Sequence, residues 1–135
     1  MEFDFMEWES DLGLQYIPAL PVRFNGFPVG HVLVDTGATV TILPMVLREV
    51  FGVDLDKSKA LTLSGASGER FIAYPSSSKV TYSLEQSGFR PLSWNGVVFF
   101  VNSTDTLLLG HYQCLDQLIT TFDGPRRKLK VEMKR

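Results

Sequence analysis

The segment VLVDTGAT, residues 32–39, is the most informative part of this chain. Its first three residues, Val32–Val34, are apolar and mostly β-branched, which predicts a buried strand that delivers Asp35 into a loop. A carboxylate at the end of a buried strand has lost water, so its protonation and hydrogen bonds matter energetically. Thr36 adds a hydroxyl group, and Gly37 lets other backbone approach because it has no side chain. The alternative interpretation is an ordinary strand-ending turn, in which Asp and Gly are common.

Short segments on both sides of this one predict a mostly β domain. Asn25-Gly26 separates two runs rich in β-branched or aromatic residues, 16–24 and 28–34, and is a strong signal for a two-residue hairpin turn. Small residues at 64–68 separate two more such runs and predict the tip of a second hairpin. Further strands are expected at 79–84, 96–101, 107–109, 119–122 and 129–133.

Helix signals are few and short. Residues 43–51 read as a short helix, because Pro44 suits a first helical turn and Gly52 suits the position after a last one. Residues 111–118 could form another short helix. Many short strands with one or two short helices indicate an all-β domain, closed or sandwich-like.

Composition excludes several classes of protein. The chain has 135 residues, of which 44% are hydrophobic and 21% charged, values typical of one folded domain. Its net charge of -2 disfavours a general nucleic-acid binder, and no apolar stretch approaches the roughly 20 residues that span a bilayer. Cys114 is the single cysteine, which excludes an intrachain disulfide, and no basic secretory leader is visible. We therefore expect a cytoplasmic protein that binds neither nucleic acid nor membranes.

The two ends of the chain carry opposite charge. Residues 1–12 hold five acidic residues and no Lys or Arg, whereas residues 125–135 hold six basic residues and one acidic residue. Such ends could attract each other within one molecule or between two molecules. The alternative is a pair of solvated tails that keep the protein soluble.

Other candidate sites carry weaker signals. His111 and Cys114 have helical spacing, but a metal site normally needs three or four ligands. Cys114 could be a nucleophile paired with a histidine, although a small buried apolar role is the commoner one. The Gly65–Gly68 segment lacks the Lys-Ser/Thr end of a phosphate-binding loop. We therefore expect no metal and no cofactor.

The order of these features resembles the retropepsin-like aspartic proteases, single-domain relatives of pepsin that include the retroviral proteases. Residues 32–40 fit the active-site signature of that family, and residues 107–110, Leu-Leu-Leu-Gly, fit its second motif. The hairpin tip at 64–68 lies where the family has its flap. Residues 121–124 resemble the turn before the last strand in cellular members. The resemblance covers about residues 17–133.

This resemblance implies a fold, a domain division and a set of site residues. The expected fold is an all-β, retropepsin-like closed β-barrel with a flap hairpin and one or two short helices. The domain would span residues 17–135, after an acidic N-terminal segment, residues 1–16. Asp35 would be catalytic, and the remaining site residues are the loop supports Thr36, Gly37 and Ala38, the substrate-binding flap residues Gly65, Ala66, Ser67 and Gly68, and the second-motif residues Leu108, Leu109 and Gly110.

The resemblance also implies an activity and a partner. Peptide hydrolysis in this family needs two carboxylates around one water, and the chain has one Asp-Thr-Gly. The implied protein is therefore an aspartic endopeptidase that works as a two-fold homodimer, with Asp35 of each chain at the axis and an extended polypeptide as substrate. The alternative is a catalytically inactive homodimer that binds extended peptides. A third interpretation is a domain excised from a longer protein.

Two positions depart from the retroviral pattern. Retroviral members often carry Asp at the position of Thr39 and Arg at the position of His111, and these two residues form an ion pair. Both partners differ here, so no charge is left alone and the fold is not threatened. Related dimers also interleave their chain termini in a shared sheet, where the acidic start and the basic end could pair.

Overall fold

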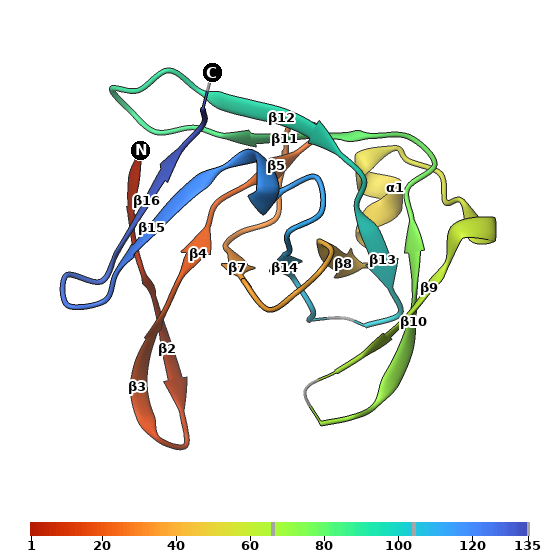
Figure 1. Ribbon diagram of the computed structural model, residues 1–135, viewed down its shortest axis with the longest axis horizontal. Coiled ribbons are helices and arrows are strands. Elements are labelled where there is room, and N and C mark those ends of the chain that lie inside the picture. The colour runs from red at the N-terminus through yellow and green to blue at the C-terminus, as the bar shows by residue number, and fades with distance from the viewer. Residues whose placement is uncertain (66, 104, 135) are drawn as a thin grey trace.

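The computed structural model describes residues 1–65, 67–103 and 105–134, and these form short strands with very little helix (Figure 1). The all-β expectation is confirmed. One sheet has seven strands, which lie in the order β4 (Ala19–Leu20), β7 (Val32–Val34), β14 (Leu108–Leu109), β8 (Ile42–Pro44), β13 (Phe99–Val101), β10 (Arg70–Pro75) and β9 (Leu61–Ser64).

Three smaller sheets accompany it. The four-stranded sheet has the order β12 (Leu92–Gly96), β11 (Val80–Leu84), β5 (Arg23–Phe24) and β6 (Phe27–Pro28). The three-stranded sheet has the order β1 (Glu2–Asp4), β16 (Lys128–Glu132) and β15 (Ile119–Asp123), and a separate hairpin joins β2 (Met6–Ser10) to β3 (Gly13–Ile17). Closure of these sheets into a barrel stays a prediction.

The hairpin at Asn25-Gly26 is confirmed. Its strands next to the turn, β5 and β6, belong to the four-stranded sheet, and its outer strands, β4 and β7, belong to the seven-stranded sheet. Asn25 and Gly26 have φ values of 51° and 83°, the left-handed conformation that a two-residue hairpin turn requires. Next to the turn, β5 pairs with β6; farther away, β4 pairs antiparallel with β7. The hairpin therefore carries β7 out of the four-stranded sheet and into the seven-stranded one.

The helix lies later than expected. Leu43 and Pro44 belong to β8, which runs parallel to β13, and α1 spans only Leu47–Phe51. The expected helical turn at Pro44 was wrong because strand pairing with a distant segment overrides local helix preference. Gly52 ends α1 as expected: its φ is 67°, and its amide donates to Arg48 and Glu49 carbonyl oxygens. Two single-turn 3₁₀ helices occur at Lys57–Lys59 and Leu115–Gln117, the second inside the expected helix at 111–118.

An aromatic cluster holds the two larger sheets and α1 together. The Phe24 ring lies 5.1 Å from the Tyr82 ring at right angles and 5.5 Å from the Phe51 ring in a stacked arrangement. Tyr82 also contacts Trp94, and Phe51 contacts Phe100. Edge-to-face and offset arrangements of this kind are favourable beyond their buried area, so the cluster fixes the body against which the site loops are built.

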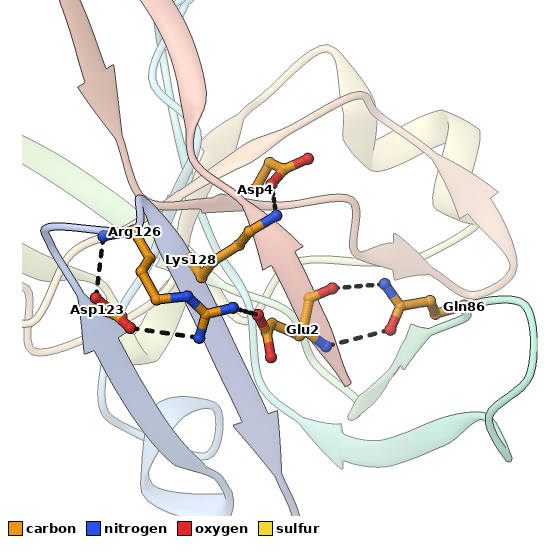
Figure 2. Close-up of polar contacts among 6 residues, drawn as sticks. All are labelled: Glu2, Asp4, Gln86, Asp123, Arg126 and Lys128. Carbon is orange, nitrogen blue, oxygen red and sulfur yellow. Dashed lines mark hydrogen bonds and ion pairs between the residues drawn. The ribbon is translucent and has the colours of Figure 1, made fainter.

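The oppositely charged ends pair with each other inside the chain (Figure 2). Strand β1 lies antiparallel to β16, with Glu2 opposite Lys130 and Asp4 opposite Lys128. Arg126 Nη2 lies 3.4 Å from Glu2 Oε1, and the Lys128 ammonium contacts the Asp4 carboxylate. The interpretation of two solvated tails is therefore wrong for these residues.

The first residues are thus part of the β structure. Glu2 also exchanges two hydrogen bonds with Gln86: the Gln86 amide donates to the Glu2 carbonyl oxygen at 2.6 Å and accepts from its N–H (Figure 2). Strand β3 spans the expected boundary at residue 16, and that domain division stays a prediction. Among the described residues, no helix is long and apolar enough to cross a membrane.

Candidate active site

The Asp35 loop is folded back on its own carboxylate. Asp35 follows β7, and its amide donates to the Leu109 carbonyl oxygen at 3.1 Å. The Gly37 amide donates to Asp35 Oδ1 at 2.9 Å, and the Ala38 amide donates to the Asp35 carbonyl oxygen at 3.1 Å. A Cβ on Gly37 would lie 3.3 Å from Asp35 Oδ1, so a side chain there would crowd the acid. The loop therefore fixes the carboxylate with backbone groups.

The second motif, residues 107–110, packs against the Asp35 loop. Strand β14 runs parallel to β7 and antiparallel to β8, which places Leu109 opposite Val34. A Cβ on Gly110 would lie 2.2 Å from the Val40 carbonyl oxygen and 2.4 Å from its carbon, a clash with backbone that cannot rotate away. The Gly110 amide donates to the hydroxyl of Thr41, which is fully buried. Residue 110 must therefore be glycine, and the fully buried Leu109 before it must be apolar.

A groove of about 580 Å³ lies over the Asp35 loop. Asp35 is the only acidic side chain among the described residues that line it. The Asp35 loop forms one wall of the groove, the β9–β10 hairpin forms another, and Ile42 and Leu108 complete it with apolar side chains. The lining residues are Asp35, Gly37, Ala38, Thr39, Val40, Ile42, Leu63, Ser64, Gly65, Phe71 and Leu108. A single carboxylate therefore faces an otherwise uncharged groove beneath a hairpin.

Comparison with known proteins agrees with this geometry. Residues 20–112 match the family model described as "Aspartyl protease". The chain belongs to the aspartyl protease family. Among solved structures it is similar to the EIAV protease complexed with the inhibitor HBY-793, with 19% sequence identity and a TM-score of 0.50 over 72% of this chain and 84% of that one. No curated protein sequence matches it. The expected retropepsin-like, retroviral-protease-like fold is thereby confirmed.

The structure brings together some of the site residues expected from the aspartyl protease resemblance. Asp35, Gly37, Ala38, Gly65 and Leu108 line one groove. Leu109 and Gly110 lie behind it, since Leu109 is fully buried and Gly110 abuts Val40. Thr36 is exposed on the Asp35 loop.

The hairpin at the position expected for the flap has the expected strands. Strands β9 and β10 pair antiparallel, and its tip is closed by the Gly65 amide, which donates to the Glu69 carbonyl oxygen at 2.8 Å. Gly68 donates to Gly65 at 3.0 Å and has a φ of 85°, which favours glycine. The Ser67 hydroxyl donates to the Glu69 carboxylate and lowers the pKa of that group. Ala66 lies outside the described residues.

Two residues that sequence reasoning did not assign to the site take part in it. Thr41 holds Gly110, as described above. His111 Nε2 lies 2.6 Å from the Thr36 carbonyl oxygen, so the ring donates to the Asp35 loop, and the His111 amide donates to the Ala38 carbonyl oxygen at 3.0 Å. The signal for His111 was its position directly after the second motif.

Cys114 is not placed for chemistry. Its side chain is fully buried, and this burial raises the pKa of the thiol to about 12. A thiol that stays protonated is a poor nucleophile and a poor metal ligand. His111, its expected partner at helical spacing, is exposed and bonded to Thr36. In the parts of the chain that the structure describes, no group of three or more His, Cys, Asp or Glu residues could hold a metal ion.

Proposed function

We propose that this member of the aspartyl protease family is an endopeptidase that works as a two-fold homodimer. The observation that carries the proposal is the single acidic side chain, Asp35, in the groove beneath the flap. Hydrolysis with an unactivated water needs one group to take a proton from it and another to donate a proton to the carbonyl oxygen. One carboxyl group cannot do both at once, so the second comes from Asp35 of another copy across a two-fold axis.

The two carboxyl groups would act as one unit. Like charges this close cannot both ionise easily, so the pair shares one proton. The ionised Asp35 takes a proton from the water, whose oxygen attacks the carbonyl carbon of the peptide, while the protonated Asp35 donates to the carbonyl oxygen. The resulting gem-diol then collapses: the Asp35 that took the water proton donates it to the leaving nitrogen, the carbon–nitrogen bond breaks, and the other Asp35, now ionised, takes a proton from a gem-diol hydroxyl, which leaves a carboxylic acid and restores one proton on the pair. The Gly37 amide donates to Asp35 Oδ1 at 2.9 Å and so fixes the orientation of this carboxyl group.

The groove fits an extended polypeptide. Strand β9 lies at the outer edge of the seven-stranded sheet, and among the described residues no further strand pairs with it there, so an extended peptide could add as the next strand. Leu63 and Phe71 from the flap face Val40, Ile42 and Leu108 across the groove. We therefore propose that apolar residues flank the bond that is cut.

The test is cleavage of a mixed peptide library by the wild-type protein and by Asp35→Asn. We expect wild-type cleavage next to apolar residues, inhibition by a pepstatin-type compound, no cleavage by the variant, and sedimentation of both proteins as dimers. Peptide binding by both proteins without cleavage would overturn the endopeptidase proposal and favour an inactive peptide-binding homodimer. Cleavage by a protein that sediments only as a monomer would overturn the shared site.

A further inference from the structure

Strand β16 has both of its edges occupied by strands of its own chain. Residues 128–130 pair with β1 on one side, and residues 128–132 pair with β15 on the other. Next to β1, the Val131 amide donates to the Met1 carbonyl oxygen at 2.8 Å, and the Met1 ammonium donates to the Val131 carbonyl oxygen at 3.0 Å. A strand of a second copy therefore cannot pair with β16 unless β1 or β15 first leaves it. The sheet that related dimers build from interleaved termini is closed here within one chain.

The proposed homodimer therefore needs another contact surface close to Asp35. A stable interface buries about 800 Å² on each partner and involves roughly 20–30 residues of each. The Asp35 loop, residues 35–39, is much smaller than this. Exposed apolar side chains near the loop are the groups that a second copy would bury with the largest gain in free energy.

The β2–β3 hairpin presents such side chains. Trp8, Leu12 and Leu14 are 52%, 86% and 52% exposed. In the part of the chain that the structure describes, no third strand pairs with β2 or β3, so the hairpin projects as a two-stranded arm. Large apolar side chains gathered on a projecting element indicate an interaction surface, and Trp is among the residues that interfaces favour. These three residues are called the hairpin tip below.

The base of the hairpin has a fixed position. Met6 pairs with Ile17, and both side chains are partly buried. The Arg127 guanidinium lies 3.6 Å from the centre of the Tyr16 ring, and this cation–π contact ties β3 to the turn between β15 and β16. A tip on a fixed base loses little conformational freedom when a partner covers it, which favours binding.

The hairpin begins directly beside the strand that carries Asp35. Strand β3 ends at Ile17, and the next residue, Pro18, accepts a hydrogen bond at 2.9 Å from the amide of Val34, the residue before Asp35. In Figure 1 the β2–β3 and β9–β10 hairpins extend from the same side of the body, with β7 and β14 between them. A second copy that brings its own Asp35 to the groove therefore lies against the β2–β3 hairpin.

Charge indicates that the two hairpins of a dimer do not pack on each other. Residues 6–17 include Glu7, Glu9 and Asp11 and no Lys or Arg. Two hairpins in contact would bring both sets of carboxylates together, and like charges across an interface are strongly unfavourable. Each hairpin therefore lies on the body of the other copy, which is the reciprocal arrangement that a two-fold axis generates.

We propose that the β2–β3 hairpin is a dimerisation arm whose tip, Trp8, Leu12 and Leu14, packs on the body of a second copy of this chain. This inference rests on the proposed function, because the shared Asp35 site decides where the second copy lies. It makes the paired termini an internal feature of each chain and assigns dimerisation to the hairpin. Two other occupants are outcomes of the test: substrate on the tip, or a second copy paired along the outer edge of β15.

The first experiment measures the dimer dissociation constant by sedimentation, and peptide cleavage, over a dilution series. The double variant Leu12→Ser/Leu14→Ser removes apolar side chains from the tip. Phe89→Ser is the matched control, because Phe89 is 54% exposed in the loop between β11 and β12, which lies well apart from the hairpin in Figure 1. Phe122→Ser, at a residue 42% exposed on β15, tests the competing surface.

The tip variant should raise the dissociation constant at least about tenfold, as expected for apolar anchors at an interface. Its specific activity should fall only at concentrations where it dissociates, and kcat/KM should equal the wild-type value once the dimer is restored. Phe89→Ser should match the wild-type protein in both measurements.

Three results would overturn the arm. One is an equal dissociation constant for the tip variant and Phe89→Ser. Dissociation caused by Phe122→Ser alone would favour pairing along β15. An unchanged dimer with lower kcat/KM at every concentration would favour substrate on the tip. A wild-type protein that is monomeric throughout, or a dimer that cuts no peptide, would instead be a failure of the proposed function.

The second experiment uses Trp8 as a reporter and needs no peptide. Trp94 is buried, so a change in tryptophan emission on dimerisation comes from Trp8. The emission of Asp35→Asn should shift to the blue as its concentration rises, with the midpoint that sedimentation gives, and Trp8→Phe should abolish the shift. A dimer that forms without this shift would contradict the proposed arm.

Discussion

His111 Nε2 donates a hydrogen bond to the Thr36 carbonyl oxygen over 2.6 Å, and this contact ties the residue after the second motif to the loop that carries Asp35. Two backbone bonds reinforce it: the His111 amide donates to Ala38, and the Tyr112 amide donates to Thr39. Retroviral members often have an ion pair between the positions of Thr39 and His111. Here a side-chain bond to backbone connects the same two segments.

Removing this contact should loosen the Asp35 loop. His111→Ala should lower kcat roughly threefold to tenfold with little change in KM, the size expected for one hydrogen bond that positions a catalytic group. His111→Gln should restore much of kcat, because its amide nitrogen reaches about as far as Nε2, whereas the shorter His111→Asn should not. Steady-state kinetics checks this, and equal kcat for the Ala, Asn and Gln variants would show that the donor does not position the loop.

The strand β1 should be held by its apolar side chains more than by its ion pairs. Phe3 packs against the core, so Phe3→Ala should lower the free energy of unfolding by about 1–3 kcal/mol. Asp4 is largely exposed where it contacts Lys128, so Asp4→Asn should cost less than about 1 kcal/mol, and less still in high salt. Urea unfolding at two salt concentrations measures both, and a larger loss for Asp4→Asn would contradict this ranking.

The Cys114 thiol should be inert in the folded protein. Burial raises its pKa to about 12, so the thiolate that reacts with alkylating reagents is scarce near neutral pH. We expect modification by a maleimide at pH 8 to be at least about a hundredfold slower in the native protein than in urea. Mass spectrometry over time gives both rates, and equal rates would mean that the thiol is not buried in solution.

Activity should follow a bell-shaped pH profile. In the proposed homodimer the Asp35 pair would be active with one proton, so activity should fall in acid, where both carboxyl groups are protonated, and in base, where both are ionised. We expect the optimum at roughly pH 4–6.5, because Ala38 offers no hydroxyl to stabilise the charged form. Ala38→Ser supplies that hydroxyl, so both limbs should move to lower pH. Rates on one peptide over pH 2–8 measure the profile, and an upward shift would refute the hydrogen-bond argument.

The sequence predicted the turns and loops that are formed by residues close together in the chain. Asn25-Gly26 forms its turn because left-handed backbone is needed there, and Gly52 ends α1 for the same reason. The Asp35 loop is likewise built from bonds among Asp35, Gly37 and Ala38. These features depend on neighbours within four residues, so their residue types predict them.

Features that depend on distant pairing were missed. Pro44 suits a helix locally, but β8 pairs with β13 more than fifty residues later. The contact between His111 and Thr36 likewise depends on β14 lying beside β7, which spacing does not encode. The strands within residues 2–17 were missed too, although the turn-forming residues around Gly13 are a signal for the β2–β3 hairpin.

The proposed sharing of one Asp35 pair between two chains is tested most directly by mixing subunits. Wild-type protein is incubated with Asp35→Asn until the chains have exchanged, and cleavage of one peptide is measured at constant wild-type concentration. Because one ionisable carboxyl group per site is insufficient, activity should fall to about half at equal amounts and to about one tenth with a tenfold excess of the variant. Activity that stays constant, or rises, as the variant is added would contradict a catalytic site made from two copies of Asp35.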